Sequence, residues 1–357
     1  VQLEEEFMVG LKKRGVITAV AGILAAVTIT GCSAAPDNDA TVVTVGTEKV
    51  SYGVANFYAR MQQAQYESFY AGLMGMSADT MWSQEVEEGK TYEENMKDSI
   101  LESLENMYLV KQHASEYKVE LTDEEKKKID KAAEEFVEDN TLEDKEVVSG
   151  YKKYVKEYLE LATIQQKMDA PMKEGVDENV SDEDAAQKKI EYVQFSYTKK
   201  DDSGQSVQMT DDEKKAEKEK AQTFLDTVSA DPDKDMNAAA ASAEKEVQTA
   251  TFDSESSTLN ADLLKAADAL ENVGDVTSLI ETDDGIYVAK LTSKLDREAT
   301  DQKKKEIVEE RKQKQYEDQV ETWRKETDIK VDKKEWKKVD FEDQGVNVKQ
   351  TATDSEK

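Results

Sequence analysis

Ile190-Glu-Tyr-Val-Gln-Phe-Ser-Tyr197 decides the fold class of this chain. Apolar and polar residues alternate along it, which is the spacing of a half-buried β-strand. Before it, apolar residues recur at helical spacing; after it come predicted helices and a second strand, Gly285–Leu291. A strand, several helices and a closing strand within about a hundred residues predict a compact α+β module. We therefore expect an α+β protein in which this module interrupts a mainly helical chain.

The helical part is predicted on both sides of the module. A short strand pair at Thr41–Val50 opens it, and Thr122-Asp-Glu-Glu125 has the spacing of a helix capping box. A long charged helix and a last strand, Ile329–Val331, follow the module. The expected domains are a helical lobe built from segments 42–176 and 295–342, an inserted domain at 186–294, and a polar, disordered tail at 343–357.

The first segment has the parts of an export signal. Lys12, Lys13 and Arg14 precede the apolar run Val16–Ile29, and Gly31-Cys32 follows at a small-residue cleavage site. The cysteine after Thr-Gly resembles a bacterial lipobox, which implies a lipid on Cys32 and a position on the outer face of the cytoplasmic membrane. The expected segments are a signal peptide at 1–31, a lipidated tether at 32–41, and a translation start at Met8 that leaves 1–7 untranslated.

Composition excludes several classes of function. The formal net charge of −31 argues against nucleic acid, because that affinity comes from basic residues that neutralise phosphates. The only cysteine is assigned to the anchor, and the only histidine, His113, cannot form a His-His pair. Asp231–Asp235 hints at a calcium loop, but Met236 stands where that loop needs glycine, so we interpret it as a solvated turn. We expect neither a metal nor a cofactor.

Several segments together resemble the PrsA/SurA-like extracytoplasmic foldase lipoproteins. In that family a helical chaperone lobe is interrupted by a parvulin-type peptidyl-prolyl isomerase domain. The resemblance implies a membrane-anchored protein that binds newly exported, unfolded polypeptides. It rests on Val42–Ser51, Met96–Leu109, Val119–Glu125, Val273–Ile280 and Asp284–Leu291.

The catalytic residues of the parvulin domain do not carry over. The family has one histidine in the first strand of that domain and another in the last, and Tyr192 and Tyr287 stand at these positions. The apolar residues of the proline pocket fall near Leu259, Leu263 and Asp268, and an aspartate on its floor would hydrate a pocket that must be dry. The resemblance thus predicts a degenerate domain without isomerase activity. An active isomerase stays an alternative, as does an adaptor lipoprotein with one dedicated partner.

A methionine- and aromatic-rich region is the candidate client-binding surface, because flexible thioethers and rings adapt to many apolar partners. The alternative is that these residues form the core of the helical lobe. The sequence leaves open whether that lobe forms a homodimer. The candidate client-binding residues are Met61, Tyr66, Phe69, Tyr70, Met74, Met76, Met81 and Trp82.

Overall fold

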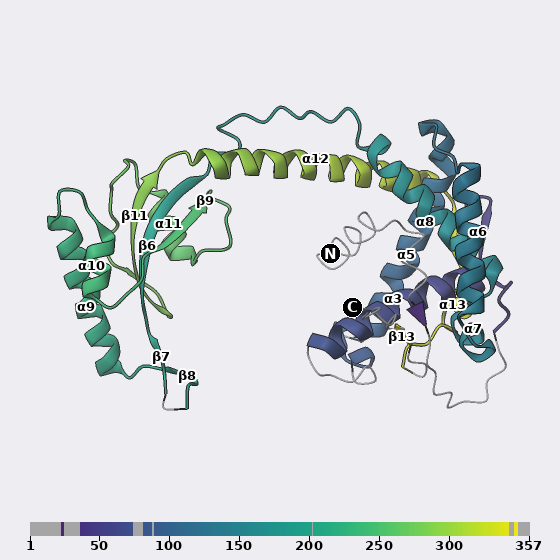
Figure 1. Ribbon diagram of the computed structural model, residues 1–357, viewed down its shortest axis with the longest axis horizontal. Helices are drawn as coiled ribbons and strands as arrows, with labels where there is room; N and C mark the ends of the chain where they lie inside the picture. Colours follow the sequence, from purple (N-terminus) through teal and green to yellow (C-terminus); the bar gives the residue numbers. More distant parts are fainter. Residues whose placement is uncertain are drawn as a thin grey trace, which may run out of the picture. The chain divides into compact units, whose positions relative to one another are not determined.

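The chain divides into two compact units. A computed structural model describes residues 23–24, 36–73, 81–87, 89–201, 203–342 and 346–348. Unit 1 consists of residues 1–175 and 313–357, and unit 2 of residues 176–312. The long helix α12 (Arg297–Glu326) begins in unit 2 and ends in unit 1 (Figure 1).

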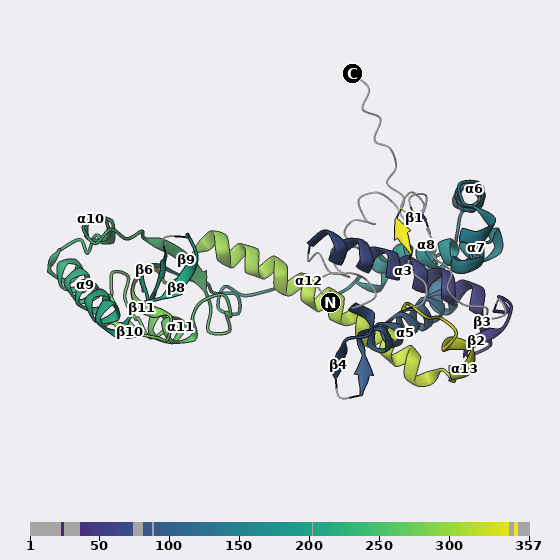
Figure 2. The same ribbon diagram turned by 90° about the horizontal axis from the view of Figure 1, so that it is seen from below.

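Unit 1 is mainly helical. Its helices pack around one apolar core, to which both parts of the chain contribute. A hairpin, β4–β5, projects from it (Figure 2). Its helices are α3 (Tyr52–Leu73), α5 (Tyr92–His113), the 3-10 helix η2 (Ala114–Tyr117), α6 (Asp123–Glu138), α7 (Leu142–Val148), α8 (Lys152–Met172) and α13 (Lys333–Trp336). Its strands are β1 (Ile23–Leu24), β2 (Thr41–Val45), β3 (Glu48–Ser51), β4 (Glu85–Glu87), β5 (Lys90–Thr91), β12 (Ile329–Val331) and β13 (Asn347–Val348).

Local sequence signals set where these helices begin. The Thr122 hydroxyl accepts a hydrogen bond from the backbone N–H of Glu125, and the Glu125 carboxylate accepts one from the backbone N–H of Thr122. Thr91 and Glu94 form the same capping box at the start of α5. Such boxes satisfy amides that the first helical turn leaves unpaired. The capping box predicted at Thr122 is confirmed.

Strands from the two separate parts of unit 1 pair in a small antiparallel sheet. Its strand order is β12-β2-β3, and Ile329 of β12 lies opposite Val45 of β2. Val42, Val43 and Val45 are fully buried, so β2 is a central strand covered on its faces. Residues separated by most of the sequence therefore complete one core.

Unit 2 is an α+β module. A four-stranded antiparallel sheet with the order β10-β11-β6-β9 forms its centre. Its strands are β6 (Lys188–Ser196), β7 (Thr198–Lys200), β8 (Ser206–Gln208), β9 (Gln248–Phe252), β10 (Ile280–Glu281) and β11 (Gly285–Ser293). Its helices are α9 (Asp211–Ala230), α10 (Met236–Ser242) and α11 (Ala261–Asp268).

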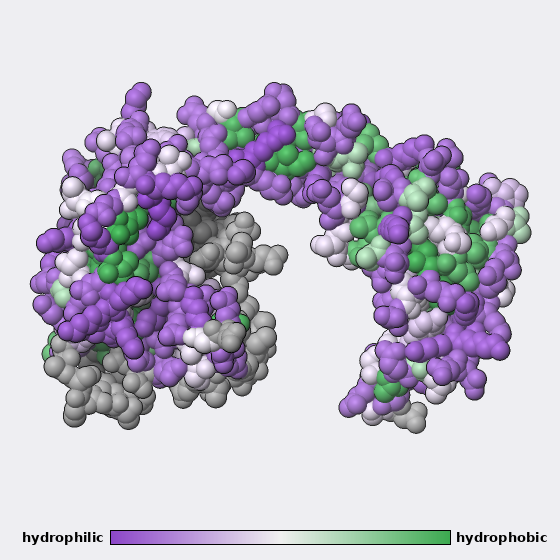
Figure 3. All heavy atoms as spheres, turned by 180° about the vertical axis from the view of Figure 1, so that it is seen from behind, coloured by the Kyte–Doolittle hydropathy of each residue, from purple (hydrophilic) through white to green (hydrophobic). Residues whose placement is uncertain are grey.

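The two faces of this sheet carry separate apolar clusters. Val193 lies opposite Val288 in the β6–β11 register, and both pack with Phe224 of α9 on one face. Tyr287 of β11 packs with Leu263 of α11 on the other face. Helices α9 and α10 thus lie on one side of the sheet and α11 on the other (Figure 1). Hydrophilic side chains dominate the visible surface of both units (Figure 3).

The segment that precedes β6 runs along the first half of α12. Arg297 and Lys304 bind the carboxylate of Asp182 at 2.7 and 2.5 Å, and these cations hold its pKa well below the usual range. Arg311 donates to the backbone carbonyls of Asp177 and Asn179 at 2.9 and 3.1 Å. Basic side chains of α12 therefore hold residues 177–182 within unit 2.

The expected α+β class is confirmed, and one expected boundary differs in the structure. Helix α10 ends at Ser242, shortly before Glu244, which adopts a left-handed φ of 57°. Gln248–Phe252 forms an edge strand of the unit 2 sheet. The prediction of a disordered tail from residue 343 onward is wrong at Val346, which is 1% exposed, and at Asn347–Val348, which pair with Ile23–Leu24.

Candidate functional site

The two tyrosines predicted at the parvulin histidine positions lie on the same face of the unit 2 sheet. Tyr192 is on β6 and Tyr287 on the adjacent strand β11, with ring centroids 6.3 Å apart. Their hydroxyls point to different partners: Tyr192 donates to Gln248 Oε1 at 2.6 Å, and Tyr287 to Asp284 Oδ2 at 2.9 Å. Neither hydroxyl bonds to the other tyrosine.

Leu259 and Leu263 join this face, but Asp268 does not line its floor. Leu263 is buried on α11, and Leu259 packs against the same apolar cluster as Tyr287. Asp268 ends α11 with 44% of its side chain exposed and forms an ion pair with Lys188 at 2.8 Å. The expected hydration of the pocket floor by Asp268 is thus wrong, because this carboxylate faces solvent and Lys188.

The hydroxyls of Tyr192 and Tyr287 both act as hydrogen-bond donors on this face. Burial, together with the neighbouring Asp284 carboxylate, raises the pKa of Tyr287 far above its ordinary value, so its phenol stays neutral at physiological pH. Asp284 keeps a lowered pKa because Thr282 and Tyr287 donate to it.

The methionine- and aromatic-rich region lies largely in the core of unit 1. Met61, Met81 and Trp82 are 4%, 4% and 0% exposed, and Tyr66 packs against the same core while partly buried. The prediction that Met61, Met81 and Trp82 form a surface open to clients is therefore wrong, because helix packing buries these side chains. The remaining candidates lie outside the described residues, Met74 and Met76 entirely and Phe69 and Tyr70 by their side chains.

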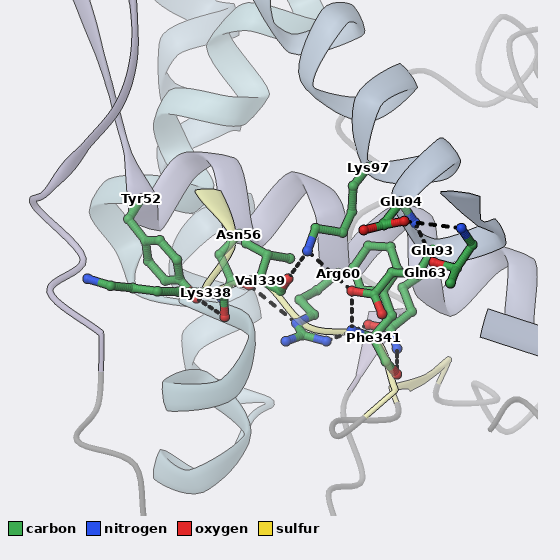
Figure 4. A network of polar contacts seen from close by, with 11 residues as sticks. Tyr52, Asn56, Arg60, Gln63, Glu93, Glu94, Lys97, Lys338, Val339 and Phe341 are labelled. Carbon is green, nitrogen blue, oxygen red and sulfur yellow. Dashed lines mark hydrogen bonds and ion pairs between the residues drawn. The ribbon is translucent and has the colours of Figure 1, made fainter. Parts of the chain in front are cut away.

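A ridge of buried polar side chains on α3 was not predicted. Asn56, Arg60, Gln63 and Glu67 follow one another at helical spacing, and each is at most 8% exposed. Arg60 donates to Gln63 Oε1 at 2.7 Å and to Asn56 Oδ1 at 3.3 Å (Figure 4). Gln63 in turn donates to Glu67 Oε1 at 2.7 Å. We call these four residues the α3 polar ridge. Burial lowers the pKa of Arg60 and raises that of Glu67.

The α3 polar ridge and α5 bind the backbone of the segment after α13. This C-terminal segment, residues 338–342 and 346, has neither helix nor strand from 339 to 342. Five of its backbone groups bond to side chains, and Figure 4 shows the part around Lys338, Val339 and Phe341. The bonds are Tyr52 OH to Lys338 O (3.4 Å), Lys97 Nζ to Val339 O, Phe341 N to Glu93 Oε1 (3.0 Å), Gln63 Nε2 to Phe341 O (3.2 Å) and Val346 N to Glu67 Oε2 (3.2 Å).

The apolar side chains of the C-terminal segment are buried beside Trp82. Val339, Phe341 and Val346 are 0%, 1% and 1% exposed. The Phe341 ring lies 4.9 Å from the Trp82 ring and 5.6 Å from the Arg60 guanidinium carbon. Trp82 also donates its indole N–H to Glu67 at 2.9 Å. One predicted client-binding residue thus contacts a polypeptide segment, and that segment belongs to the same chain.

The other singled-out positions have structural roles or lie outside the description. Cys32 and most of the predicted signal peptide lie outside the described residues. His113 stacks on Trp323 with ring centroids 4.2 Å apart and approaches Glu116 at 2.7 Å. Asp231 and Asp235 accept backbone hydrogen bonds in a turn before α10. Among the described residues, no three His, Cys, Asp or Glu side chains gather in a way that could hold a metal ion.

Within the described part of the chain, no helix has the length and apolar character that a membrane crossing requires.

The chain is similar to solved structures of PrsA from several bacteria. Foldase protein PrsA from Lactococcus lactis matches with 13% identity over 83% of this chain and 96% of its own, at a TM-score of 0.30. The peptidylprolyl isomerase PrsA from Bacillus cereus matches with 18% identity over 85% and 98%, at a TM-score of 0.26. Foldase protein PrsA from Streptococcus pneumoniae matches with 16% identity over 73% and 99%, at a TM-score of 0.24. No protein-family model matches the chain, and no curated protein sequence does.

Proposed function

We propose that this protein is a PrsA-like chaperone or foldase, anchored outside the bacterial cytoplasmic membrane through Cys32, that binds newly exported, unfolded polypeptides. The observation that carries the proposal is the order of its parts. The N-terminal strands and helices form one unit with the C-terminal strand β12, and an α+β module of residues 176–312 is inserted between them. This is the arrangement that the resemblance of the sequence motifs implies.

We further propose that the inserted module lacks isomerase activity. Prolyl isomerisation must lower a barrier of about 18–20 kcal/mol within a dry, shaped pocket. Tyr192 and Tyr287 bond away from each other, to Gln248 and Asp284, which supports a face that holds the sheet together and does no chemistry.

The chaperone proposal is tested by suppression of aggregation. The soluble fragment from Ser33 to Lys357 is added to a chemically unfolded test protein during dilution, and light scattering is followed. We expect scattering to fall as the fragment approaches equimolar amounts. An inert protein of similar negative charge is the control, because charge alone keeps complexes soluble. Unchanged scattering at excess fragment contradicts the proposal.

The first alternative, an active peptidyl-prolyl isomerase, is tested with a protease-coupled proline peptide. We expect no acceleration over the uncatalysed rate. If acceleration is seen, the variants Tyr192→Phe, Tyr287→Phe and Asp268→Ala locate it. Activity that survives all three means that the pocket lies elsewhere in the chain.

The second alternative is an adaptor lipoprotein with one dedicated partner. Co-purification from membranes separates the two: a chaperone yields many exported proteins, and an adaptor yields one companion in fixed ratio. The same preparation tests the anchor, because Cys32→Ala should move the protein from the membrane to the soluble fraction. Light scattering of the soluble fragment decides whether it forms a homodimer.

A further inference from the structure

The C-terminal segment is held mainly through its backbone. Three of its backbone groups accept or donate within 3.0–3.2 Å of Glu93, Gln63 and Glu67, and none of these bonds depends on the side chain of the residue that is bound. A site that binds the backbone in this way recognises a polypeptide whatever its sequence, as other peptide-recognition sites do through main-chain hydrogen bonds. The groove that holds the segment is formed by the α3 polar ridge, α5 and Trp82.

The groove also offers apolar contacts at fixed places. Phe341 fits between the Trp82 ring at 4.9 Å and the Arg60 guanidinium at 5.6 Å, and Val339 and Val346 are buried on either side of it along the chain. An occupant therefore needs a large apolar or aromatic side chain, a smaller one two residues before it, and another a few residues later. Unfolded polypeptides present such patterns often, whereas folded proteins bury them.

The groove supplies both polarities of hydrogen bond to a backbone. Lys97 and Gln63 donate to carbonyls, while Glu93 and Glu67 accept from amides. Gln63, Glu67 and Glu93 are buried, so leaving them without partners would be costly. Burial raises the pKa of Glu67, which agrees with a carboxylate that depends on its donors in this groove. A second polypeptide with the same backbone groups can satisfy them equally well.

We propose that this groove is a binding site for apolar segments of unfolded client proteins, and that the C-terminal segment is an internal ligand which clients displace. The proposal rests on the proposed chaperone function, for which it names the client site. The segment is suited to exchange because residues 339–342 belong to no helix or strand, and the strand Asn347–Val348 pairs with Ile23–Leu24, which lie in the predicted signal peptide and are absent from the mature chain. As a covalently attached competitor it acts at an effective concentration of about millimolar, which lowers the apparent affinity for clients.

The test uses a fluorescent peptide with the sequence of residues 337–348, Lys-Lys-Val-Asp-Phe-Glu-Asp-Gln-Gly-Val-Asn-Val. Its anisotropy is measured with the mature chain and with the variant Phe341→Ala/Val346→Ala, which weakens the internal ligand. We expect the variant to bind the peptide at least about tenfold more tightly, because the tethered competitor is weakened. Adding Gln63→Ala to the variant should reduce binding again. The control Val331→Ala, at a 36% exposed position on β12, should bind as the unchanged chain does.

Because the double variant removes two core side chains, a second measurement uses the unchanged chain. Hydrogen exchange of the Phe341 and Val346 amides is followed while the unlabelled peptide is added. We expect both amides to exchange faster as the peptide binds, since Glu93 and Glu67 are then occupied by another backbone. Peptide binding that leaves both amides protected places the peptide elsewhere and overturns the proposal. Absence of peptide binding by both the unchanged chain and the variant also overturns it.

Three outcomes separate this proposal from the alternatives. A dimer that appears in light scattering together with faster exchange would assign the groove to the segment of a second copy, which overturns the client assignment. Suppressed aggregation with unchanged amide protection would retain the chaperone function and reject this site. Peptide displacement without suppressed aggregation would retain the groove and reject the chaperone function.

Discussion

Removal of the Arg324 side chain should destabilise unit 1 because it leaves a buried carboxylate without its cation. Arg324 lies near the end of α12 and binds Glu105 of α5, Nη1 to Oε2, at 2.8 Å. It also donates to Asn106 Oδ1 at 2.9 and 3.2 Å. The Glu105 side chain is only 6% exposed, whereas that of Arg324 is 23% exposed. Arg324→Ala leaves Glu105 in place without its cation.

The size of the effect follows from burial. Breaking a buried ion pair by removing one partner costs about 3–5 kcal/mol, because the remaining charge is neither solvated nor paired. Arg324 is partly exposed, and water can enter the space that it leaves. We therefore expect the free energy of unfolding to fall by about 3 kcal/mol, the lower end of that range. Lys325→Ala is the matched control: its ion pair with Glu321 is 72% and 53% exposed and is worth at most about 1 kcal/mol.

The loss should also depend on pH in a defined direction. Burial already raises the pKa of Glu105, and Arg324 opposes that rise. Without Arg324 the pKa of Glu105 in the folded state rises further. Between the unfolded and the folded pKa values, the folded variant therefore holds a proton on Glu105 that the unfolded chain has lost. A raised carboxyl pKa gives stability that is complete below the unfolded value, about 4.3, and is lost as pH rises through the folded value. The deficit of Arg324→Ala is thus larger at about pH 8 than at about pH 5.

Urea unfolding followed by tryptophan fluorescence measures the free energy of unfolding of unit 1 selectively. The chain has 3 tryptophans, and Trp82, Trp323 and Trp336 all belong to unit 1. The double variant Glu105→Gln/Arg324→Ala should recover part of the loss and lack the added pH dependence, because no buried charge remains. An Arg324→Ala loss no greater than that of Lys325→Ala, or equal at both pH values, would refute the reasoning.

Three further changes test other parts of the structure. Gly285→Ala should lower the stability of unit 2 by about 3 kcal/mol or more, since an added Cβ would lie 2.5 Å from the Phe195 carbonyl oxygen at a φ of +154°. The control Gly274→Ala, at a φ of +90° and facing open space, should lower it by about 1 kcal/mol. Thermal unfolding followed by far-UV circular dichroism measures both. Tyr287→Phe should lower the stability of unit 2 by about 1 kcal/mol at neutral pH in the same measurement. The loss should shrink as pH falls through the lowered pKa of Asp284, because the protonated acid gains little from the tyrosine donor. A stability loss that is unchanged at acidic pH contradicts this prediction. Thr122→Ala should cost unit 1 about 1 kcal/mol by urea unfolding, and Thr122→Ser almost nothing; equal losses would mean that the capping hydroxyl is irrelevant.

Sequence patterns were sufficient where the deciding interactions are local. The Thr122–Glu125 box was predictable because both partners lie within one helical turn. The family resemblance placed Tyr192 and Tyr287 on the first and last strands of the inserted module, and alternation along β6 and β11 puts both side chains on one face. Period and capping thus predicted the main elements, whereas the degenerate pocket came from the family resemblance and stays a prediction.

Sequence patterns failed where distant residues decide burial. Phe341 and Val346 stand among polar residues, and only Glu93, Gln63 and Glu67, far away in the sequence, show that they are buried. The α3 polar ridge left a signal that could have been used: polar residues at helical spacing within an otherwise apolar helix. Its partner could not be identified, because backbone groups carry no sequence signature.

The insertion of unit 2 between the two parts of unit 1 sets an order of folding as the exported chain emerges from the membrane. Residues 176–312 are contiguous and can fold as soon as they have emerged, because domains generally fold as units. Unit 1 must wait for residues 313–346, which bring β12 to β2 and Phe341 to α3. Pairings across such separations form slowly. The later-starting module is therefore finished first, and the groove on α3 stays uncovered until the end of the chain arrives.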